Sequence, residues 1–226
     1  MSNNSTPHVS KAYDSQVRKT IPYYDLFLKE TIDIVDTINP NPDLWLDTGC
    51  GTGNMVELAL DYFKKTKFML ADPSHEMIRV SKNKLRERDR INFIGTFPTQ
   101  DLCSIDIKTP NVITAVQCHH YLDKSTREKA TQVCFNLLSD NGIYVTFENI
   151  CPSTEVGVNY VKERWAKYQI SQLKDKTDTQ NHIKRFGVNY FPITIEEHIE
   201  LLKKTGFKTV ELLWLSYMQA GFYGVK

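Results

Sequence analysis

A glycine-rich loop between an apolar strand and an amphipathic helix constrains this chain more than any other segment. Residues 44–54 read Leu-Trp-Leu-Asp-Thr-Gly-Cys-Gly-Thr-Gly-Asn, so glycines stand at three alternate positions, Gly49, Gly51 and Gly53. Glycine permits a sharp turn and a close approach of a ligand to the backbone. A loop of this kind, after the first strand of an open α/β sheet, binds nucleotide-like ligands. Asn54 stands where a dinucleotide-binding Gly-x-Gly-x-x-Gly needs its third glycine, and the absence of a following Gly-Lys-Ser/Thr excludes a P-loop.

Short apolar runs alternate with helical patterns along most of the chain. The runs predict five strands, at residues 44–48, 67–71, 91–95, 111–117 and 143–148. Alternating strands and helices imply right-handed crossovers and a parallel sheet covered on both faces. Two further predicted strands, 209–217 and 221–225, have so short a connection that they must be antiparallel. The sequence therefore predicts a three-layer α/β sandwich.

Local signals refine this outline. Ser74 is expected to cap a helix, another helix is expected from Ser125 to Leu138, and Thr194-x-x-Glu197 has the spacing of a capping box. We interpret residues 1–40 as a helical arm and 152–192 as a helical insertion within one domain, 1–226.

Composition bounds the class of protein. Hydrophobic residues make up 41% of the chain and the net charge is +1, which is typical of a globular protein without general affinity for nucleic acid or anionic membranes. No apolar run approaches the roughly 20 residues that span a bilayer. The polar segment Met1–Ser10 lacks a signal-peptide core, and five cysteines without a Cys-x-x-Cys pair favour reduced thiols. We expect a cytoplasmic protein without a membrane partner.

The segment Asp47-x-Gly49-x-Gly51-x-Gly53 resembles motif I of class I S-adenosylmethionine (SAM) dependent methyltransferases. The resemblance covers residues 10–226 and implies a Rossmann-like, seven-stranded, mostly parallel sheet with the last strand antiparallel. It also implies SAM as cofactor, S-adenosylhomocysteine as product and a small-molecule methyl acceptor. Alternatives are a tRNA-modifying or carboxy-SAM-related enzyme and a SAM-binding protein without catalysis.

The resemblance assigns roles around the cofactor. Asp72, 19 positions beyond Gly53 at the end of the second strand, is expected to bind both ribose hydroxyls, although an Asp-Pro turn would also explain it. Thr96, Asp101 or apolar contact at Phe97 would hold the adenine, and Gln117 would line the methionine portion. The expected cofactor-binding residues are Tyr13, Arg18, Asp47, Gly49, Cys50, Gly51, Gly53, Asp72, Pro73, Met77, Thr96, Phe97 and Gln117.

The arm resembles that of a branch which includes carboxy-SAM synthases. The similarity rests on Ala12-Tyr13-Asp14, Val17-Arg18-Lys19 and Ile21-Pro22-Tyr23-Tyr24. In that branch the arm closes over the cofactor. Arg18 would then pair with the cofactor carboxylate, or else lie on the solvent face of a docking helix. Tyr13 and Tyr24 would wall the site.

Cys118-His119-His120-Tyr121 follows the fourth predicted strand, where a methyl acceptor would lie. His119 or His120 is the candidate general base, since imidazole titrates near neutrality, although either ring can instead pack as part of the strand end. Adjacent histidines on an extended backbone point to opposite faces, which makes joint chelation awkward, so no metal is expected.

Acceptor recognition is expected in the insertion. Aromatic and arginine side chains alternate there, which suits a planar or carboxylated small molecule but also a helix that packs on the core. They are Tyr160, Arg164, Trp165, Tyr168, Arg185, Tyr190 and Phe191.

A nucleic-acid substrate is disfavoured. The basic run between Arg79 and Arg90 also contains Glu87 and Asp89, which fits a solvated helix face. A pI near 7.6 lacks the basic footprint of RNA binding. A homodimer is compatible with the sequence.

Overall fold

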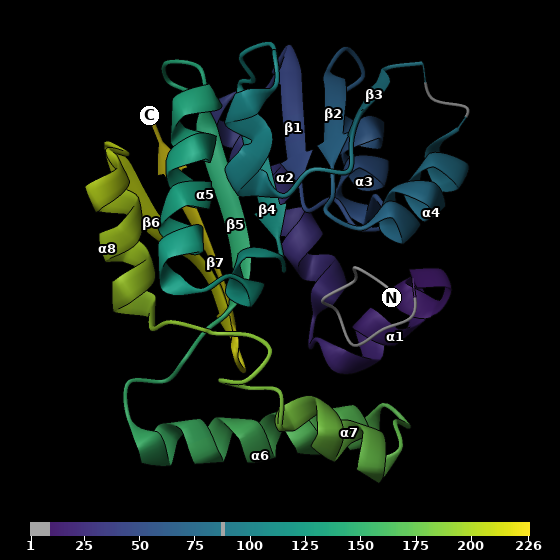
Figure 1. The fold of residues 1–226 in the computed structure, drawn as a ribbon, viewed down its shortest axis with the longest axis vertical. Coiled ribbons are helices and arrows are strands. Elements are labelled where there is room, and N and C mark those ends of the chain that lie inside the picture. Colours follow the sequence, from purple (N-terminus) through teal and green to yellow (C-terminus); the bar gives the residue numbers. More distant parts are fainter. Residues whose placement is uncertain (1–9, 87–88) are drawn as a thin grey trace.

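The seven predicted strands form one sheet in the computed structural model, which describes residues 10–86 and 89–226 (Figure 1). The strands are β1 (Leu44–Thr48), β2 (Lys67–Ala71), β3 (Ile91–Gly95), β4 (Val112–Val116), β5 (Ile143–Asn149), β6 (Thr209–Ser216) and β7 (Gln219–Val225). Their order across the sheet is β3-β2-β1-β4-β5-β7-β6. Strand β7 is antiparallel to both β5 and β6, whereas β1 to β5 pair in parallel. The predicted topology, with its antiparallel last strand, is confirmed.

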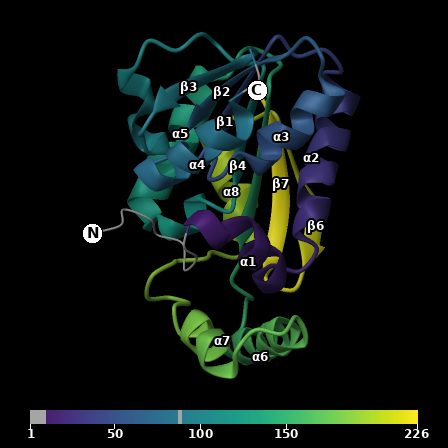
Figure 2. The same cartoon turned by 90° about the vertical axis from the view of Figure 1, so that its right-hand side faces the viewer.

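Helices cover both faces of this sheet. They are α1 (Tyr13–Thr20), α2 (Tyr24–Ile38), α3 (Asn54–Tyr62), α4 (His75–Leu85), α5 (Lys124–Leu137), α6 (Glu155–Ser171), α7 (Lys176–Ile183) and α8 (Ile195–Thr205). In Figure 2, α2 and α3 lie on one side of the sheet and α5 on the other. Helices α2 to α4 pack on Trp45 and Phe147, and α5 and α8 pack on Leu46 and Tyr144. Successive residues of a strand therefore point into two separate hydrophobic cores, one on each face of the sheet.

Helix ends follow their local signals. The Ser74 hydroxyl accepts from the Met77 N–H and caps α4. Thr194 and Glu197 form the predicted capping box of α8. The start of α5 differs from the prediction, because Asp123 rather than Ser125 is the cap and its carboxylate accepts from the Thr126 N–H.

Two segments lie beyond the carboxyl ends of β1, β4 and β5. The first is helix α1 of the arm; residues 1–9 lie outside the described part, and α2 packs on one face of the sheet. The second is the lid, residues 152–192, whose helices α6 and α7 form a separate layer below the sheet (Figure 1). Trp165, Tyr190 and Met218 form a small buried cluster between this layer and the sheet.

Within the described residues, no helix combines the length and the apolar character needed to cross a bilayer. Glu87 and Arg88, in the middle of the basic run after α4, lie outside the described residues.

Candidate active site

The glycine loop, residues 49–53, turns sharply at the carboxyl end of β1. Gly49, Gly51 and Gly53 have φ values of 67°, 54° and 84°, a region that side chains rarely adopt. A Cβ on Gly49 would lie 2.6 Å from the Cβ of Cys118, so this glycine lets the loop pack against the turn after β4. A Cβ on Gly51 would meet nothing within 4 Å. Gly51 therefore faces open space, as a backbone that cradles a ligand requires.

Asp72 lies beside this loop at the end of β2. Its Oδ2 accepts from the Gly51 N–H and its Oδ1 from the Ser74 N–H, both at 2.8 Å. Burial raises the pKa of the Asp72 carboxyl, and these two bonds oppose that rise. Each carboxylate oxygen keeps a second lone pair, so the group can still accept two hydroxyls of a ribose.

Asp47 is buried at the base of the crevice. Its Oδ1 accepts from the Thr114 hydroxyl at 2.7 Å, and that hydroxyl accepts from the Trp45 indole N–H at 2.9 Å. Burial raises the pKa of Asp47 to about 7. The bond to Thr114 ties β1 to β4, and a bound cation nearby would favour the ionised carboxylate.

Gln117 supplies an unused acceptor at the end of β4. Its backbone is left-handed, with φ 56°, and its backbone N–H donates to the Phe147 oxygen at 2.6 Å. Its side-chain Oε1 is buried without a hydrogen-bond partner. Such an orphan acceptor fits the ammonium of an amino acid. Together with the open space at Gly51 and the carboxylate of Asp72, this acceptor lies at the carboxyl ends of the strands.

The arm is fastened to the glycine loop by Asp14. The Asp14 carboxylate accepts from the Thr52 hydroxyl at 2.5 Å, the Asn54 amide at 2.9 Å and the Lys84 ammonium at 2.7 Å. Burial alone would raise the pKa of Asp14, but the bonds and the charge of Lys84 lower it below its usual value. The sequence interpretation did not give Asp14 a role. The available signal was its position directly after Tyr13, as the acid of the Ala12-Tyr13-Asp14 segment.

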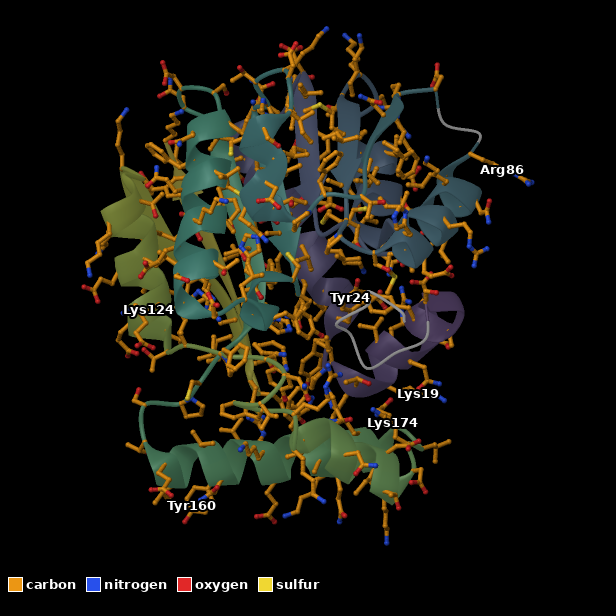
Figure 3. All side chains as sticks on the ribbon, viewed as in Figure 1. Lys19, Tyr24, Arg86, Lys124, Tyr160 and Lys174 are labelled. Carbon is orange, nitrogen blue, oxygen red and sulfur yellow. The ribbon has the colours of Figure 1, made fainter. Side chains whose placement is uncertain are left out.

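Tyr13 and Tyr24 of the arm lie beside the glycine loop. With Asp47, Gly49 and Gly51 they line a small cavity of about 20 Å³. Tyr24 points from the arm towards the sheet (Figure 3), and its hydroxyl accepts from the Asn54 amide at 3.3 Å. Burial, with Tyr24, Tyr121 and Asp72 nearby, raises the pKa of Tyr13.

Arg18 faces elsewhere. Its guanidinium binds the Asp25 carboxylate at 2.7 Å, and both side chains are about half exposed. The Arg18 guanidinium, which the resemblance assigned to the carboxylate of the cofactor, is therefore paired with Asp25. The role of Arg18 towards the cofactor stays a prediction.

The other expected cofactor residues lie in the loops that follow β1, β2 and β3 and in the first turn of α4. The Cys50 N–H donates to the Ala71 oxygen at 3.0 Å, and Met77 is buried in the first turn of α4. Pro73 is exposed, the Thr96 hydroxyl contacts the His75 Nδ1 at 3.0 Å, and the Phe97 ring packs beside Gly95. Asp101, considered for adenine, instead lies within reach of Lys129 at 3.4 Å.

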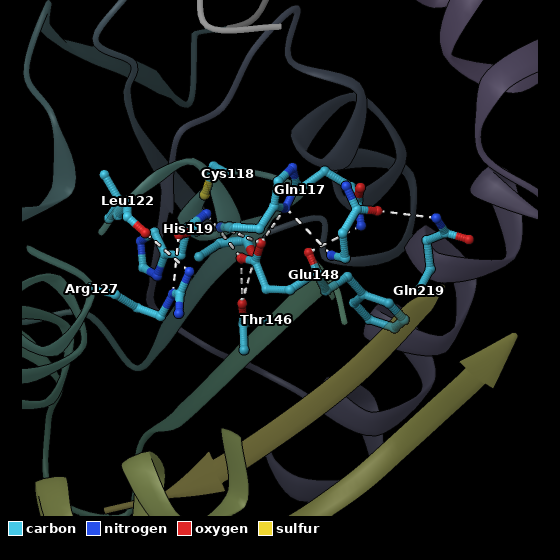
Figure 4. A network of polar contacts seen from close by, with 12 residues as sticks. Gln117, Cys118, His119, Leu122, Arg127, Thr146, Glu148 and Gln219 are labelled. Carbon is cyan, nitrogen blue, oxygen red and sulfur yellow. Dashed lines mark hydrogen bonds and ion pairs between the residues drawn. The ribbon is translucent and has the colours of Figure 1, made fainter. Parts of the chain in front are cut away.

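The two histidines lie on a turn and not on extended backbone as expected. His119–Tyr121 form a 3₁₀ helix, and both imidazoles are buried. Glu148 on β5 causes this turn, because its Oε1 accepts from the His119 N–H at 3.0 Å and its Oε2 from the His120 N–H at 2.9 Å (Figure 4). No group of three or more potential metal ligands occurs in the described parts of the chain.

His119 and His120 have different surroundings. His119 contacts the hydroxyls of Thr99 at 3.1 Å and Tyr144 at 3.2 Å, and burial lowers its pKa to about 4. His120 contacts Glu148 through Nδ1 at 2.6 Å, and its ring packs between Tyr121 and Tyr190, with centroids 4.3 and 5.9 Å away. His120 thus faces the lid, whereas His119 is enclosed in the core on the α5 side.

The lid approaches the site in a way that corrects part of the sequence interpretation. Trp165 is buried and its indole N–H donates to the Thr20 oxygen at 2.6 Å, and the Tyr168 hydroxyl donates to the Arg18 oxygen at 3.0 Å. Tyr160, expected to line the acceptor cavity, is 69% exposed and points away from the sheet (Figure 3). Tyr160 precedes Trp165 by five residues, which places it roughly 140° around the helix axis from the buried side chain and explains the difference.

A family described as "Methyltransferase domain" matches residues 46–144. The chain is similar to the class I SAM-dependent methyltransferases. The cofactor of this family is SAM.

Relatives of similar length support the assignment. The chain is 25% identical to a carboxy-S-adenosyl-L-methionine synthase of Nautilia profundicola, over 91% of this chain and 87% of that protein. It is 24% identical to the enzyme of the same name from Helicobacter hepaticus, over 92% and 89%. The solved plantazolicin methyltransferase BpumL, in complex with a substrate analogue and S-adenosylhomocysteine, superposes with a TM-score of 0.72 at 16% identity, over 98% of this chain and 92% of that one. The last likeness concerns the fold.

Proposed function

We propose that this methyltransferase holds SAM in the crevice between the glycine loop and the arm, and transfers its methyl group to a small molecule under the lid. The observation that carries this proposal is the convergence of the Gly51 backbone, the Asp72 carboxylate and the orphan Gln117 oxygen at one edge of the sheet. SAM supplies an electrophilic methyl group, so the protein has mainly to align the acceptor and exclude water.

Of the two candidate bases, we favour His120. The His119 ring contacts hydroxyls through both nitrogens, and its lowered pKa makes it a weak proton acceptor. His120 lies beside Tyr121 and Tyr190 at the junction of sheet and lid, where an acceptor would enter.

A second candidate is synthesis or use of carboxy-SAM, and the similarity to two carboxy-SAM synthases favours it. Arg18 is the arm residue that would recognise an added carboxylate, after release from Asp25. The lid would then cover a carboxylate donor instead of a methyl acceptor.

Binding separates these candidates. Thermal unfolding should be measured with SAM, S-adenosylhomocysteine and carboxy-SAM at equal concentrations, since a ligand raises the midpoint according to its affinity. Stabilisation by SAM and S-adenosylhomocysteine supports methyl transfer, and selective stabilisation by carboxy-SAM supports the second candidate. If none of the three raises the midpoint, the cofactor proposal fails.

Turnover requires a second measurement. The protein should be incubated with methyl-labelled SAM and fractionated metabolites, and separately with RNA. We expect label in small molecules only, since a net charge of +1 gives the protein little general attraction for RNA. The five free cysteines suit a reducing cytosol, and light scattering would test for a homodimer.

A further inference from the structure

Glu148 is a buried carboxylate that the cofactor crevice does not use. It stands near the end of β5, fully enclosed, and four donors converge on its two oxygens. Three are the backbone N–H groups of His119 and His120 and the His120 Nδ1. The fourth is the Thr146 hydroxyl, whose single proton is shared with the Ala115 oxygen, also 2.9 Å away (Figure 4). A site with this many donors is built for an ionised carboxylate, which only accepts hydrogen bonds.

The contact between Glu148 and His120 determines where the proton of a neutral His120 ring lies. The Glu148 Oε2 and the His120 Nδ1 are 2.6 Å apart, a distance that two acceptors do not keep without a proton between them. The Asn149 N–H also approaches Nδ1, but at 3.4 Å, so the carboxylate contact dominates. With the proton on Nδ1, the lone pair of the neutral ring is on Nε2.

We propose that Glu148 is the positioning residue of the reaction: it fixes His120 as the Nδ1–H tautomer and presents Nε2 as the base to an acceptor that must lose a proton. This inference rests on the proposed methyl transfer and narrows its substrate to hydroxyl or N–H compounds. Phenols, alcohols and ring or amine N–H groups belong to this class. Thioethers and other acceptors without a proton to lose do not need such a base.

The proposed step transfers the methyl group and removes one proton from the acceptor. A lone pair on the acceptor oxygen or nitrogen forms a bond to the methyl carbon, the carbon–sulfur bond breaks, and its electron pair remains on sulfur. The acceptor proton passes to the His120 Nε2, and the resulting imidazolium is stabilised by Glu148 before the proton leaves to water.

Other titratable groups lie near His120 on several elements. His119 and Tyr121 lie on the same turn, Tyr190 on the lid and Glu148 on β5. Arg127 on α5 donates to the His119 oxygen, and His198 on α8 lies near Glu148, where burial lowers the pKa of His198 to about 4. Glu148 is the only carboxylate in this described set, and it is the one in direct contact.

The first test reads the tautomer without any acceptor. Nitrogen-labelled histidine should be observed by NMR in the full chain, with His120→Asn used for assignment. We expect a protonated Nδ1 and an unprotonated Nε2 for His120 at mildly alkaline pH, and loss of this pattern in Glu148→Gln. Glu163→Gln, an exposed lid variant, should leave it unchanged. A protonated Nε2 in the neutral ring of the unmodified chain would overturn the proposal.

The second test identifies the acceptor atom. With an isotope-labelled methyl group in SAM and a metabolite extract as probe, the carbon shift of the transferred methyl distinguishes oxygen, nitrogen, sulfur and carbon. We expect oxygen or nitrogen, and transfer to a thioether would refute the acceptor class. If the protein binds SAM but transfers no methyl group, the proposed function is wrong. The NMR measurement would still show whether Glu148 fixes the tautomer of His120.

The third test separates positioning from simple structural support. In Glu148→Gln we expect SAM affinity close to that of the unmodified chain, kcat lowered about 100-fold, and an acid limb of the pH–rate profile moved to lower pH. An unmoved acid limb with altered KM would assign Glu148 a structural role only. Thr146→Val, which removes one donor but keeps the carboxylate, provides a folded variant if the glutamine protein is unstable, and it should retain the tautomer.

Discussion

The glycine loop and the lid lie on the same side of the sheet but are held in different ways. The loop is fixed by residues near it in space whose positions follow from the strand order, such as Asp72 at the end of the adjacent β2. The lid is fixed by partners about 150 positions away along the chain, at Thr20 and Arg18. The cofactor half is therefore a property of the sheet, whereas the acceptor half is an attachment whose position depends on a few long-range bonds.

Removing Asp72 should break the cofactor half most strongly. In Asp72→Ala both ribose hydroxyls lose a charged acceptor, so SAM affinity should fall by at least about 2 kcal/mol, measured by calorimetry. Asp123→Ala removes a similar capping carboxylate at the start of α5, outside the proposed ribose contact, and should lower stability only. Equal SAM affinity in both variants would contradict the ribose role.

The open space at Gly51 gives a subtler test of the same half. Gly51→Ala places a methyl group where the structure has no neighbour, so it should obstruct the ligand and weaken SAM binding by about 2 kcal/mol. Gly187→Ala is the matched control, because Gly187 also has a positive φ and empty surroundings but lies in the lid. We expect both variants to lose a similar amount of stability, but only Gly51→Ala to lose SAM affinity.

The lid should loosen when one long-range bond is removed. Trp165→Phe leaves the buried Thr20 oxygen without its donor, which should lower the free energy of unfolding by about 1–2 kcal/mol. Limited proteolysis should then cut within residues 155–183 sooner, with SAM affinity little changed. Tyr160→Phe, on the exposed face of α6, should behave like the unmodified chain.

The smallest expected effect concerns pH. The pKa of Asp47 rises from 3.8 to about 7 on folding, so the folded state holds this proton more tightly than the unfolded state. Stability contributed by the protonated carboxyl is lost as pH rises between these values. Asp47→Asn should therefore stabilise the ligand-free protein by about 1 kcal/mol near pH 8 and by less near pH 5, measured by urea unfolding. Exposed Asp61→Asn should show no such pH dependence.

Much of the cofactor half could be predicted from the sequence, because its determinants are local. The three glycines predict the turn directly, and Asp72 follows an apolar run that predicts strand β2. The sheet order then brings these residues together. The individual contacts of the expected cofactor residues with SAM stay predictions.

The histidine turn and the lid could be predicted only in part. The turn at His119 depends on Glu148, 29 positions away, and nothing in the His-His sequence itself indicates a carboxylate beneath it. The aromatic residues of α6 were expected to line a cavity, but a helical repeat does not tell which face meets the arm. Trp165 met it and Tyr160 did not.

Helix α1 contacts the glycine loop through Asp14, in its first turn, and the lid through Thr20, its last residue. Eight helical residues span about 12 Å and bend little over that length. Entry of a ligand beneath Tyr13 must therefore either leave the whole helix in place or displace both of its ends. Helix α1 is therefore a rigid connection between the cofactor crevice and the lid. A mutation or a bound drug that displaces one end of this helix must also displace the other end.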